Sequence, residues 1–314
     1  MNIPVIDLKD LTGGSEAQKQ NFVAELGTAF ETVGFVAVKN HGISDELIAI
    51  LYSNVKQFFA LPQDAKRGYE IAELAGQRGY TSFGREHAKG FDAPDLKEFF
   101  QFGQVVEDKD PVKAEYPDNI YVREIPEFTA TLHHAYKAFE RAGTSLLQAI
   151  ALFLGLDEHY FDAHVHNGNS ILRAIHYPPI TTEPASAIRA EQHEDINLIT
   201  LLVGASADGL EILNKSDEWV PVTSLPDQIV VNVGDMLQRL TNNRLKSTTH
   251  RVVNPPRELW GTSRFSIPFF LHPRGNMSLA CLDSCIDEEH PKAYEDYTAM
   301  EYLNERLMEI GLKK

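Results

Sequence analysis

Three side chains in the sequence have the types and spacing of a metal site. His193 and Asp195 stand two residues apart in the string HEDIN, and His250 follows in STTHRVV. Residues two apart on an extended strand project to the same face, so this imidazole and this carboxylate would meet at one point. A third ligand from another strand would complete a set of two histidines and one carboxylate, as in non-haem Fe(II) oxygenases. The spacing therefore predicts an iron site with positions open for oxygen and a co-substrate.

Two other interpretations of the same residues remain open at this point. The charged string could be a solvated turn, although among the twelve histidines only His193 has a carboxylate two residues downstream. Zinc also binds histidine and carboxylate ligands, but HEDIN lacks the second histidine of a zinc protease motif.

A second pair of polar residues stands in the otherwise apolar string TSRFSIPFF. Arg264 and Ser266 are again two apart, so a guanidinium and a hydroxyl would share one face of a strand. A buried arginine requires an anion, and its fork of donors suits a carboxylate held in a bidentate manner. The anion could be a ligand, or one of the acidic side chains elsewhere in the fold.

The elements that must position these residues change in character along the chain. In the first half, a capping box at Ser15 and Gln18 begins one predicted helix, Ser44 begins a second, and a long amphipathic helix is predicted between Pro126 and Gly155. The string GFVAVKNHGI between the first two helices predicts a short strand. The C-terminal string YTAMEYLNERLMEIGLKK predicts a last helix.

The second half is rich in short strands. About seven are predicted between Ser170 and His272, in the strings SILRAIHY, LITLLVG, LEIL, WVPV, IVVNVG, THRVV and RFSIPFFLH. This spacing indicates a jelly roll and excludes a doubly wound βαβ sheet. We therefore expect a mainly β fold with flanking helices in a single domain over 1–314: an N-terminal helical region with short strands at 1–165, a β core at 166–275 and a C-terminal helical segment at 276–314.

Composition narrows the classes of partner. A net charge of -16 would repel a nucleic acid, and the longest apolar run, Ala149 to Leu156, is too short to cross a bilayer. The two cysteines, Cys281 and Cys285, form neither a disulfide framework nor a zinc ribbon pattern. We expect a soluble cytoplasmic protein that acts on a small molecule, without nucleic acid or membrane partners, as a monomer.

The order His193-x-Asp195, His250, Arg264-x-Ser266 resembles the iron- and 2-oxoglutarate-dependent dioxygenase superfamily, in particular its isopenicillin N synthase-like branch. The resemblance covers nearly the whole chain. It is carried by the strings IPVIDL, GFVAVKNHGI, DLKEFFQFG, YPP, GLEIL, VVNVGDMLQRLTNNRLKSTTHRVV and RFSIPFF.

This resemblance implies a double-stranded β-helix with Fe(II) on the two histidines and the aspartate. It also implies that 2-oxoglutarate chelates the iron and that its distal carboxylate lies on Arg264, Ser266 and Tyr177. Reaction with O2 would give succinate, carbon dioxide and an oxidised product, by hydroxylation or desaturation. Two departures from relatives are Ile175, where plant members commonly have asparagine, and Glu194, where many have threonine or serine; the neighbouring His176 is expected to be structural.

The substrate is the least determined part of the prediction. The long loop from Gly79 to Asp95 carries Arg85, His87 and Lys89, and loops of this kind often line binding sites. Arg85 and Phe270, which aligns with a substrate-facing aromatic of relatives, are the substrate candidates, and an acidic or amphoteric small molecule would suit the loop. A solvated loop is the alternative.

Two other functions remain open on the same residues. One is an oxidase, like isopenicillin N synthase or the aminocyclopropane oxidases, in which Arg264 and Ser266 bind another acid and no 2-oxoglutarate is consumed. The other is a non-enzymatic small-acid-binding protein, which the complete metal triad disfavours.

Overall fold

The structure, a computed structural model, describes residues 3–86, 93–223 and 225–309. These residues form twelve β-strands in two sheets, with α-helices around them. The helices are α1 (Leu8–Thr12), α2 (Glu16–Thr32), α3 (Asp45–Phe59), α4 (Gln63–Arg67), α5 (Pro126–Phe153), α6 (Asp162–Val165), α7 (Asp235–Leu240) and α8 (Ala299–Glu309). The strands are β1 (Val5–Asp7), β2 (Phe35–Lys39), β3 (Gly79–Thr81), β4 (Glu98–Gly103), β5 (Ile171–Tyr177), β6 (Ala190–His193), β7 (Ile199–Val203), β8 (Leu210–Leu213), β9 (Trp219–Pro221), β10 (Gln228–Val233), β11 (His250–Val252) and β12 (Arg264–Leu271).

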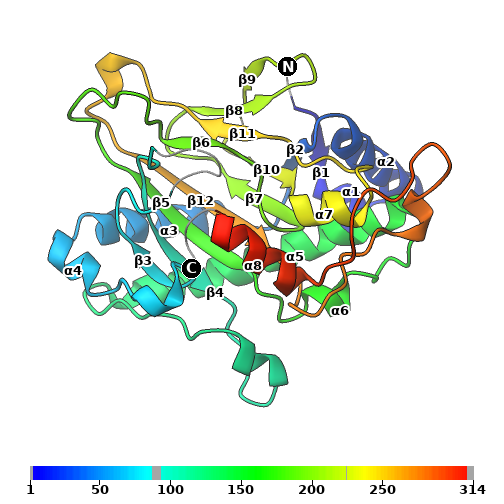
Figure 1. Ribbon diagram of the computed structural model, residues 1–314, viewed down its shortest axis with the longest axis horizontal. Coiled ribbons are helices and arrows are strands. Elements are labelled where there is room, and N and C mark those ends of the chain that lie inside the picture. Colours follow the sequence, from blue (N-terminus) through cyan, green and yellow to red (C-terminus); the bar gives the residue numbers. More distant parts are fainter. Residues whose placement is uncertain (1–2, 87–92, 224, 310–314) are drawn as a thin grey trace.

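The larger sheet has the strand order β1-β2-β10-β7-β12-β5-β4-β3, and the smaller sheet has the order β6-β11-β8-β9 (Figure 1). All neighbouring strands are antiparallel except β1 and β2. The predicted mainly β jelly roll with flanking helices is confirmed. All seven predicted strands are present, and β6 is an eighth strand in the same part of the chain.

Four strands that come from the first 165 residues widen the larger sheet beyond the predicted 166–275 core. Of these, β2 was predicted, whereas β1, β3 and β4 have no clear period-two pattern. Every residue of β4 is buried, so both faces of this strand are apolar or enclosed and the alternation that marks a half-exposed strand is absent. This part of the chain is therefore more than a helical cover, because β4 forms part of the wall beside β5.

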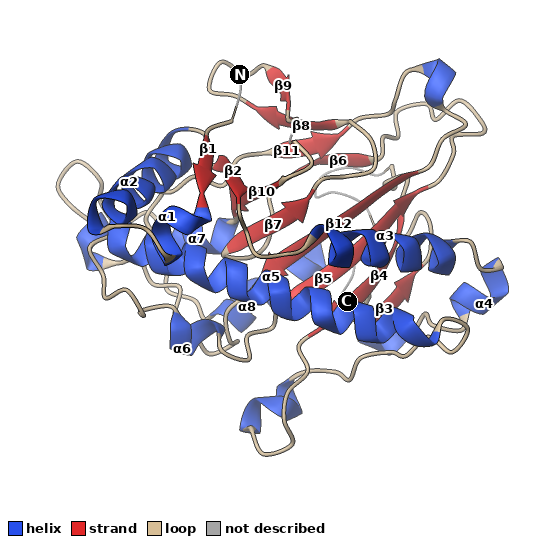
Figure 2. Cartoon of the chain, turned by 180° about the vertical axis from the view of Figure 1, so that it is seen from behind, coloured by secondary structure: helices blue, strands red, loops and turns tan. Residues whose placement is uncertain are grey.

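Helices α3 and α5 cover one face of the larger sheet. Figure 2 shows α3 and α5 lying across that face, and α5 packs on β5, β7 and β12. The predicted starts of α2 and α3 are confirmed, since Ser15 makes a capping box with Gln18 and the Ser44 side chain accepts from the Leu47 backbone N–H. Along β12, Ile267, Phe269 and Leu271 join this helix-side core. The alternate residues of β12 therefore face the space between the two sheets.

Candidate metal centre and active-site cavity

A cavity of about 640 Å³ lies between the sheets, and its wall carries most of the predicted site residues. His193, Asp195, His250, Arg264, Ser266, Tyr177 and Phe270 all line it. Helix α8 contributes to the wall as well, through Tyr302, Leu303 and Arg306 among others. Within the described chain, no helix is long and apolar enough to span a membrane.

The metal candidates meet where β6 and β11 of the smaller sheet pair. His250 and His193 are register partners, and Asp195 follows β6 after one residue. His193 Nε2 lies 3.8 Å from Asp195 Oδ1, and His250 Nε2 lies 3.6 Å from the same oxygen. One ligand atom from each of the three residues lies within 4.8 Å of the others. The predicted cluster is thus assembled, with one difference: the strand ends at His193, so Asp195 belongs to the connection between β6 and β7.

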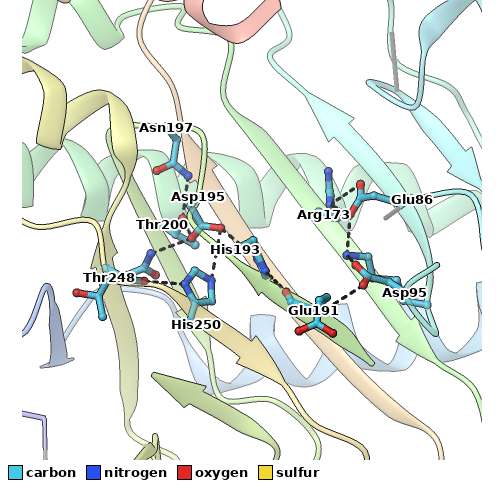
Figure 3. A network of polar contacts seen from close by, with 12 residues as sticks. Glu86, Asp95, Arg173, Glu191, His193, Asp195, Asn197, Thr200, Thr248 and His250 are labelled. Carbon is cyan, nitrogen blue, oxygen red and sulfur yellow. Dashed lines mark hydrogen bonds and ion pairs between the residues drawn. The ribbon is translucent and has the colours of Figure 1, made fainter. Parts of the chain in front are cut away.

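Hydrogen bonds orient each of the three side chains (Figure 3). His193 Nδ1 lies 2.7 Å from the carbonyl oxygen of Glu191, and His250 Nδ1 lies 3.1 Å from that of Thr248. A carbonyl can only accept, so each Nδ1 carries the proton and each Nε2 keeps its lone pair. Backbone contacts of this kind fix the tautomer of metal-binding histidines.

Asp195 is held by two side chains that sequence spacing did not reveal. Thr200 Oγ1 donates to Asp195 Oδ2 at 2.6 Å, and Asn232 Nδ2 donates to the same oxygen at 2.8 Å. Oδ1 is thereby left to face the two histidines. Burial alone would raise the pKa of Asp195, but the nearby histidines and these two hydrogen bonds outweigh it and keep this pKa below its usual value. Asp195 is therefore ionised.

The charge state of His193 also suits a metal ligand. Burial, with a further contribution from His250, lowers the pKa of His193 to about 4. A neutral imidazole with a free Nε2 beside an ionised carboxylate is the donor set that Fe(II) accepts. The residues present therefore fit the iron that the sequence predicted.

The other end of the cavity is positively charged. Arg264 is 2 % exposed, and its Nε donates to the carbonyl oxygens of Ala207 (3.0 Å) and Asp208 (3.2 Å). Its buried Nη1 has no hydrogen-bond partner among the described residues. No described acidic side chain forms an ion pair with it. The alternative of an acidic partner within the protein therefore finds no support in this part of the chain.

Tyr177 and Ser266 lie beside Arg264. Tyr177 is the register partner of Arg264 across β5 and β12, and the guanidinium carbon lies 5.0 Å from the Tyr177 ring centroid. A second buried arginine, Arg189, lies 5.9 Å from the same ring, and burial together with Arg264 lowers the pKa of Arg189 to about 10. Arg264 lines the cavity and Arg189 does not, so Arg264 can contact a ligand while the second buried positive charge behind Tyr177 adds to the attraction for an anion there.

Of the two substrate candidates from the sequence analysis, one lines the cavity and the other does not. Phe270 lies on the cavity wall, whereas Arg85 is 62 % exposed, lies 3.8 Å from Glu70 in an ion pair and does not belong to the described wall. His87 and Lys89 lie outside the described residues. His176 is buried away from the cavity, stacked on Phe265 and 2.7 Å from Glu98 Oε1, so its expected structural role is confirmed. Glu194 is exposed at the cavity wall.

Among the charged residues that line the cavity and that sequence reasoning did not single out, four form one cluster. Glu86, Asp95 and Lys97 stand near the start of β4, and Arg173 stands on β5. Arg173 was detectable in principle, because its strand string SILRAIHY places a cation on an otherwise apolar strand. The other three come from a segment whose contacts with β5 no local pattern indicates.

Family models match both halves of the chain. Residues 3–124 match the non-haem dioxygenase in morphine synthesis N-terminal family, and residues 168–273 match the 2OG-Fe(II) oxygenase superfamily. The chain is 32% identical to the 2-oxoglutarate-dependent dioxygenase ecdK of Aspergillus rugulosus, over 96% of this chain and 97% of that protein. It is also 32% identical to the proline hydroxylase buaE of Petromyces alliaceus, over 98% and 99% of the two chains.

Solved structures give the same result. A Caulobacter crescentus protein assigned to the 2OG-Fe(II) oxygenase family is 40% identical with a TM-score of 0.88, and the match covers 98% of this chain and 99% of the other. A full-length Neurospora crassa protein, crystallised in complex with alpha-KG and thymine, is 29% identical with a TM-score of 0.86, over 98% and 96%. With the triad assembled as described, the chain belongs to the 2OG-Fe(II) oxygenase superfamily and is an oxidoreductase that uses Fe(II), 2-oxoglutarate and O2.

Proposed function

We propose that His193, Asp195 and His250 hold the ferrous ion, and that Arg264, Ser266 and Tyr177 hold the distal carboxylate of 2-oxoglutarate while a small polar molecule is oxidised beside them. The observation that carries this proposal is the buried Nη1 of Arg264, a charged donor that has no partner in the described chain and lies on the wall that also carries the metal triad. An unpaired buried charge is costly, so a bound carboxylate accounts for it better than an empty pocket does.

Each side chain has a physical task in this reaction. The two histidines and the aspartate would hold the ion, and a set of only three protein ligands would leave positions for the co-substrate and oxygen. The bound iron supplies oxygen activation coupled to decarboxylation of 2-oxoglutarate. Arg264 fixes the co-substrate by a bidentate contact, Ser266 adds one hydroxyl, and the enclosed cavity holds the reacting groups in place and keeps water away.

The substrate is proposed to lie against Phe270, on the same wall. The relatives suggest its size and polarity, since one is named a proline hydroxylase and another was crystallised with thymine. Within the superfamily, we propose that the chain belongs to the isopenicillin N synthase-like branch. The oxidase alternative is disfavoured, because one relative is named a 2-oxoglutarate-dependent dioxygenase and another was crystallised with alpha-KG.

We also propose that the protein acts as a cytoplasmic monomer without nucleic acid partners. Its two cysteines are buried and free, as is usual in a reducing compartment. The net charge of -16 opposes binding to a polyanion.

The Arg264 assignment is tested by calorimetry of 2-oxoglutarate binding with an inert divalent metal in place of iron. Arg264→Lys keeps the charge but loses the fork of donors, so we expect a severe loss of 2-oxoglutarate affinity with metal affinity nearly unchanged. Ser266→Ala should cost about 1 kcal/mol, as for one ordinary hydrogen bond. Wild-type affinity in Arg264→Lys, or no 2-oxoglutarate binding in the wild type, would contradict the assignment.

A further inference from the structure

A cluster of four charged side chains lies at the cavity wall on the side of β4 and β5. Lys97 Nζ lies 2.6 Å from Glu86 Oε1 and 2.7 Å from Asp95 Oδ2, and Arg173 Nη1 donates to both oxygens of Glu86 at 3.3 Å (Figure 3). All four line the cavity, and the side chains of Glu86 and Lys97 are 10% and 6% exposed. The two negative and two positive charges of these side chains cancel, so the cluster has no net charge.

Arg173 is fixed in place, and one of its three nitrogens, Nη2, keeps both of its N–H donors unused within the described chain. Its Nε donates to Gln101 Oε1 at 3.0 Å, and its guanidinium carbon lies 4.3 Å from the Phe99 ring centroid and 5.3 Å from that of Phe270. The Nη2 atom of Arg173 has no hydrogen-bond partner among the described residues. It is also not a buried atom, so a ligand can reach it. A rigid donor at the cavity wall beside the ionised Glu86 therefore faces the space that a ligand would fill.

Arg173 lies some distance along β5 from the proposed 2-oxoglutarate end of the cavity. On β5, Arg173 is four residues before Tyr177, which corresponds to about 13 Å along the strand. The charged cluster lies beside the triad, because the Glu191 backbone N–H donates to Asp95 Oδ1 at 2.9 Å and the Glu191 carbonyl oxygen lies 2.7 Å from His193 Nδ1 (Figure 3). Arg264 and Arg173 therefore lie well apart along one wall of the cavity that the metal triad also lines.

We propose that Arg173 and Glu86 form the subsite for the prime substrate, and that it takes a small uncharged molecule with an amide-type edge, in which a carbonyl oxygen and an N–H group are adjacent. The carbonyl would accept from Arg173 Nη2 and the N–H would donate to Glu86, with the flat face of the molecule against Phe270. This inference rests on the proposed function, because it requires the 2-oxoglutarate to lie at the Arg264 end.

The charges of the wall favour this class over ions. A net anion finds no surplus positive charge here, because Lys97 and Arg173 are both paired with Glu86. A zwitterion would have to lose the hydration of two full charges, which costs more than burying a neutral amide that makes two hydrogen bonds. A ligand with a hydrogen-bond acceptor next to a donor therefore complements Arg173 and Glu86 at the lowest cost in desolvation free energy.

The test is calorimetry on the full-length protein with an inert divalent metal and saturating 2-oxoglutarate. The probes are δ-valerolactam and uracil, which carry an uncharged amide edge, and L-pipecolate, an amino acid with the same ring size as the lactam. We expect an uncharged probe to bind and L-pipecolate to bind more weakly. Arg173→Lys and Glu86→Gln should each lower the affinity for that probe at least about tenfold, as for a lost hydrogen bond to a charged group.

Arg85→Ala is the matched control, because it removes an exposed arginine that does not line the described wall. It should leave probe affinity unchanged, and all three variants should retain wild-type 2-oxoglutarate affinity, which shows that they are folded. Preferred binding of L-pipecolate, no binding of either amide, or wild-type probe affinity in Arg173→Lys would overturn the subsite while 2-oxoglutarate binding persists. Absence of 2-oxoglutarate binding in the wild type would overturn the proposed function and this inference together.

Discussion

Asp195 shows how the site depends on residues that do not touch the metal. Its Oδ2 accepts two hydrogen bonds, so the carboxylate cannot rotate, and Oδ1 stays directed at the histidines. Partners of this kind commonly change metal affinity by about ten- to a hundredfold when they are removed. The affinity for iron is therefore set in part by Thr200 and Asn232.

We expect Thr200→Val to weaken Fe(II) binding by about ten- to a hundredfold, because it removes the 2.6 Å hydrogen bond while keeping the shape of the side chain. Anaerobic metal titration measures the effect. Thr144→Val is the control, since the Thr144 hydroxyl donates only to the Glu140 carbonyl within α5. If the two variants bind iron equally well, the hydroxyl of Thr200 has no role in holding the ligand.

At the scale of elements, the connection from α2 to β2 depends on one glycine. Gly34 has a φ of 76°, and a Cβ there would lie 2.3 Å from the carbonyl oxygen of Lys246, which is backbone and cannot move aside. Gly42 has the same φ of 76°, but nothing lies within 4 Å of its Cβ position. Alanine at Gly42 would therefore be strained only by the dihedral angle, whereas alanine at Gly34 would be strained by the dihedral angle and by the steric clash.

Gly42→Ala should lower the free energy of unfolding by about 1–2 kcal/mol, the usual cost of this dihedral for a residue with a Cβ. Gly34→Ala should lower it by a further ~1–3 kcal/mol through overpacking. Urea denaturation of both variants measures the difference. Equal losses would mean that the Lys246 segment moves away freely and does not pack tightly against Gly34.

A hydrogen bond to the carboxyl group of Asp235, which has a raised pKa, links helix α8 to helix α7. Tyr302 Oη donates to Asp235 Oδ2 at 2.8 Å, and burial is the main cause that raises the pKa of Asp235 to about 8. The folded state therefore keeps a proton that the unfolded state loses at the usual value of 3.8. Asp235 thus makes the protein less stable as the pH rises from about 4 to about 8.

Asp235→Asn should remove this contribution, since an amide of the same shape still accepts from Tyr302 and never ionises. Urea unfolding at several pH values between about 4 and about 9 should show the variant gaining stability relative to the wild type as the pH rises. Parallel curves for the two proteins would show that Asp235 is not protonated in the folded state.

The sequence predicted elements well where periodicity was strong and less well where burial hides it. The capping residues Ser15 and Ser44 located two helix starts correctly. In contrast, β4 is buried on every residue and gave no alternation to detect. His193 and Asp195 were expected on one strand, but Asp195 lies in the connection between β6 and β7, where Asn232, 37 residues away, helps to hold it. Such long-range contacts cannot be inferred from local spacing.

At the scale of the whole molecule, two sheets enclose one cavity with three chemically distinct parts. The Arg264 end suits a carboxylate, the triad suits Fe(II), and the wall at Arg173 and Glu86 has no net charge. Arg85 was predicted from a loop near the site but does not line the described wall, whereas Arg173, which no prediction named, lines it from a strand. The pairing of β4 with β5, which brings Gln101 beside Arg173, explains why only the folded chain reveals this.

The most direct test of the account is succinate formation from 2-oxoglutarate by the Fe(II)-loaded protein under air, with and without a pool of small metabolites. We predict that succinate forms only when iron, 2-oxoglutarate and oxygen are all present, that the metabolite pool increases its rate, and that His250→Ala abolishes it because two protein ligands cannot retain the ion. Oxygen consumption by the iron-loaded wild type without any requirement for 2-oxoglutarate would contradict the account and favour the oxidase alternative.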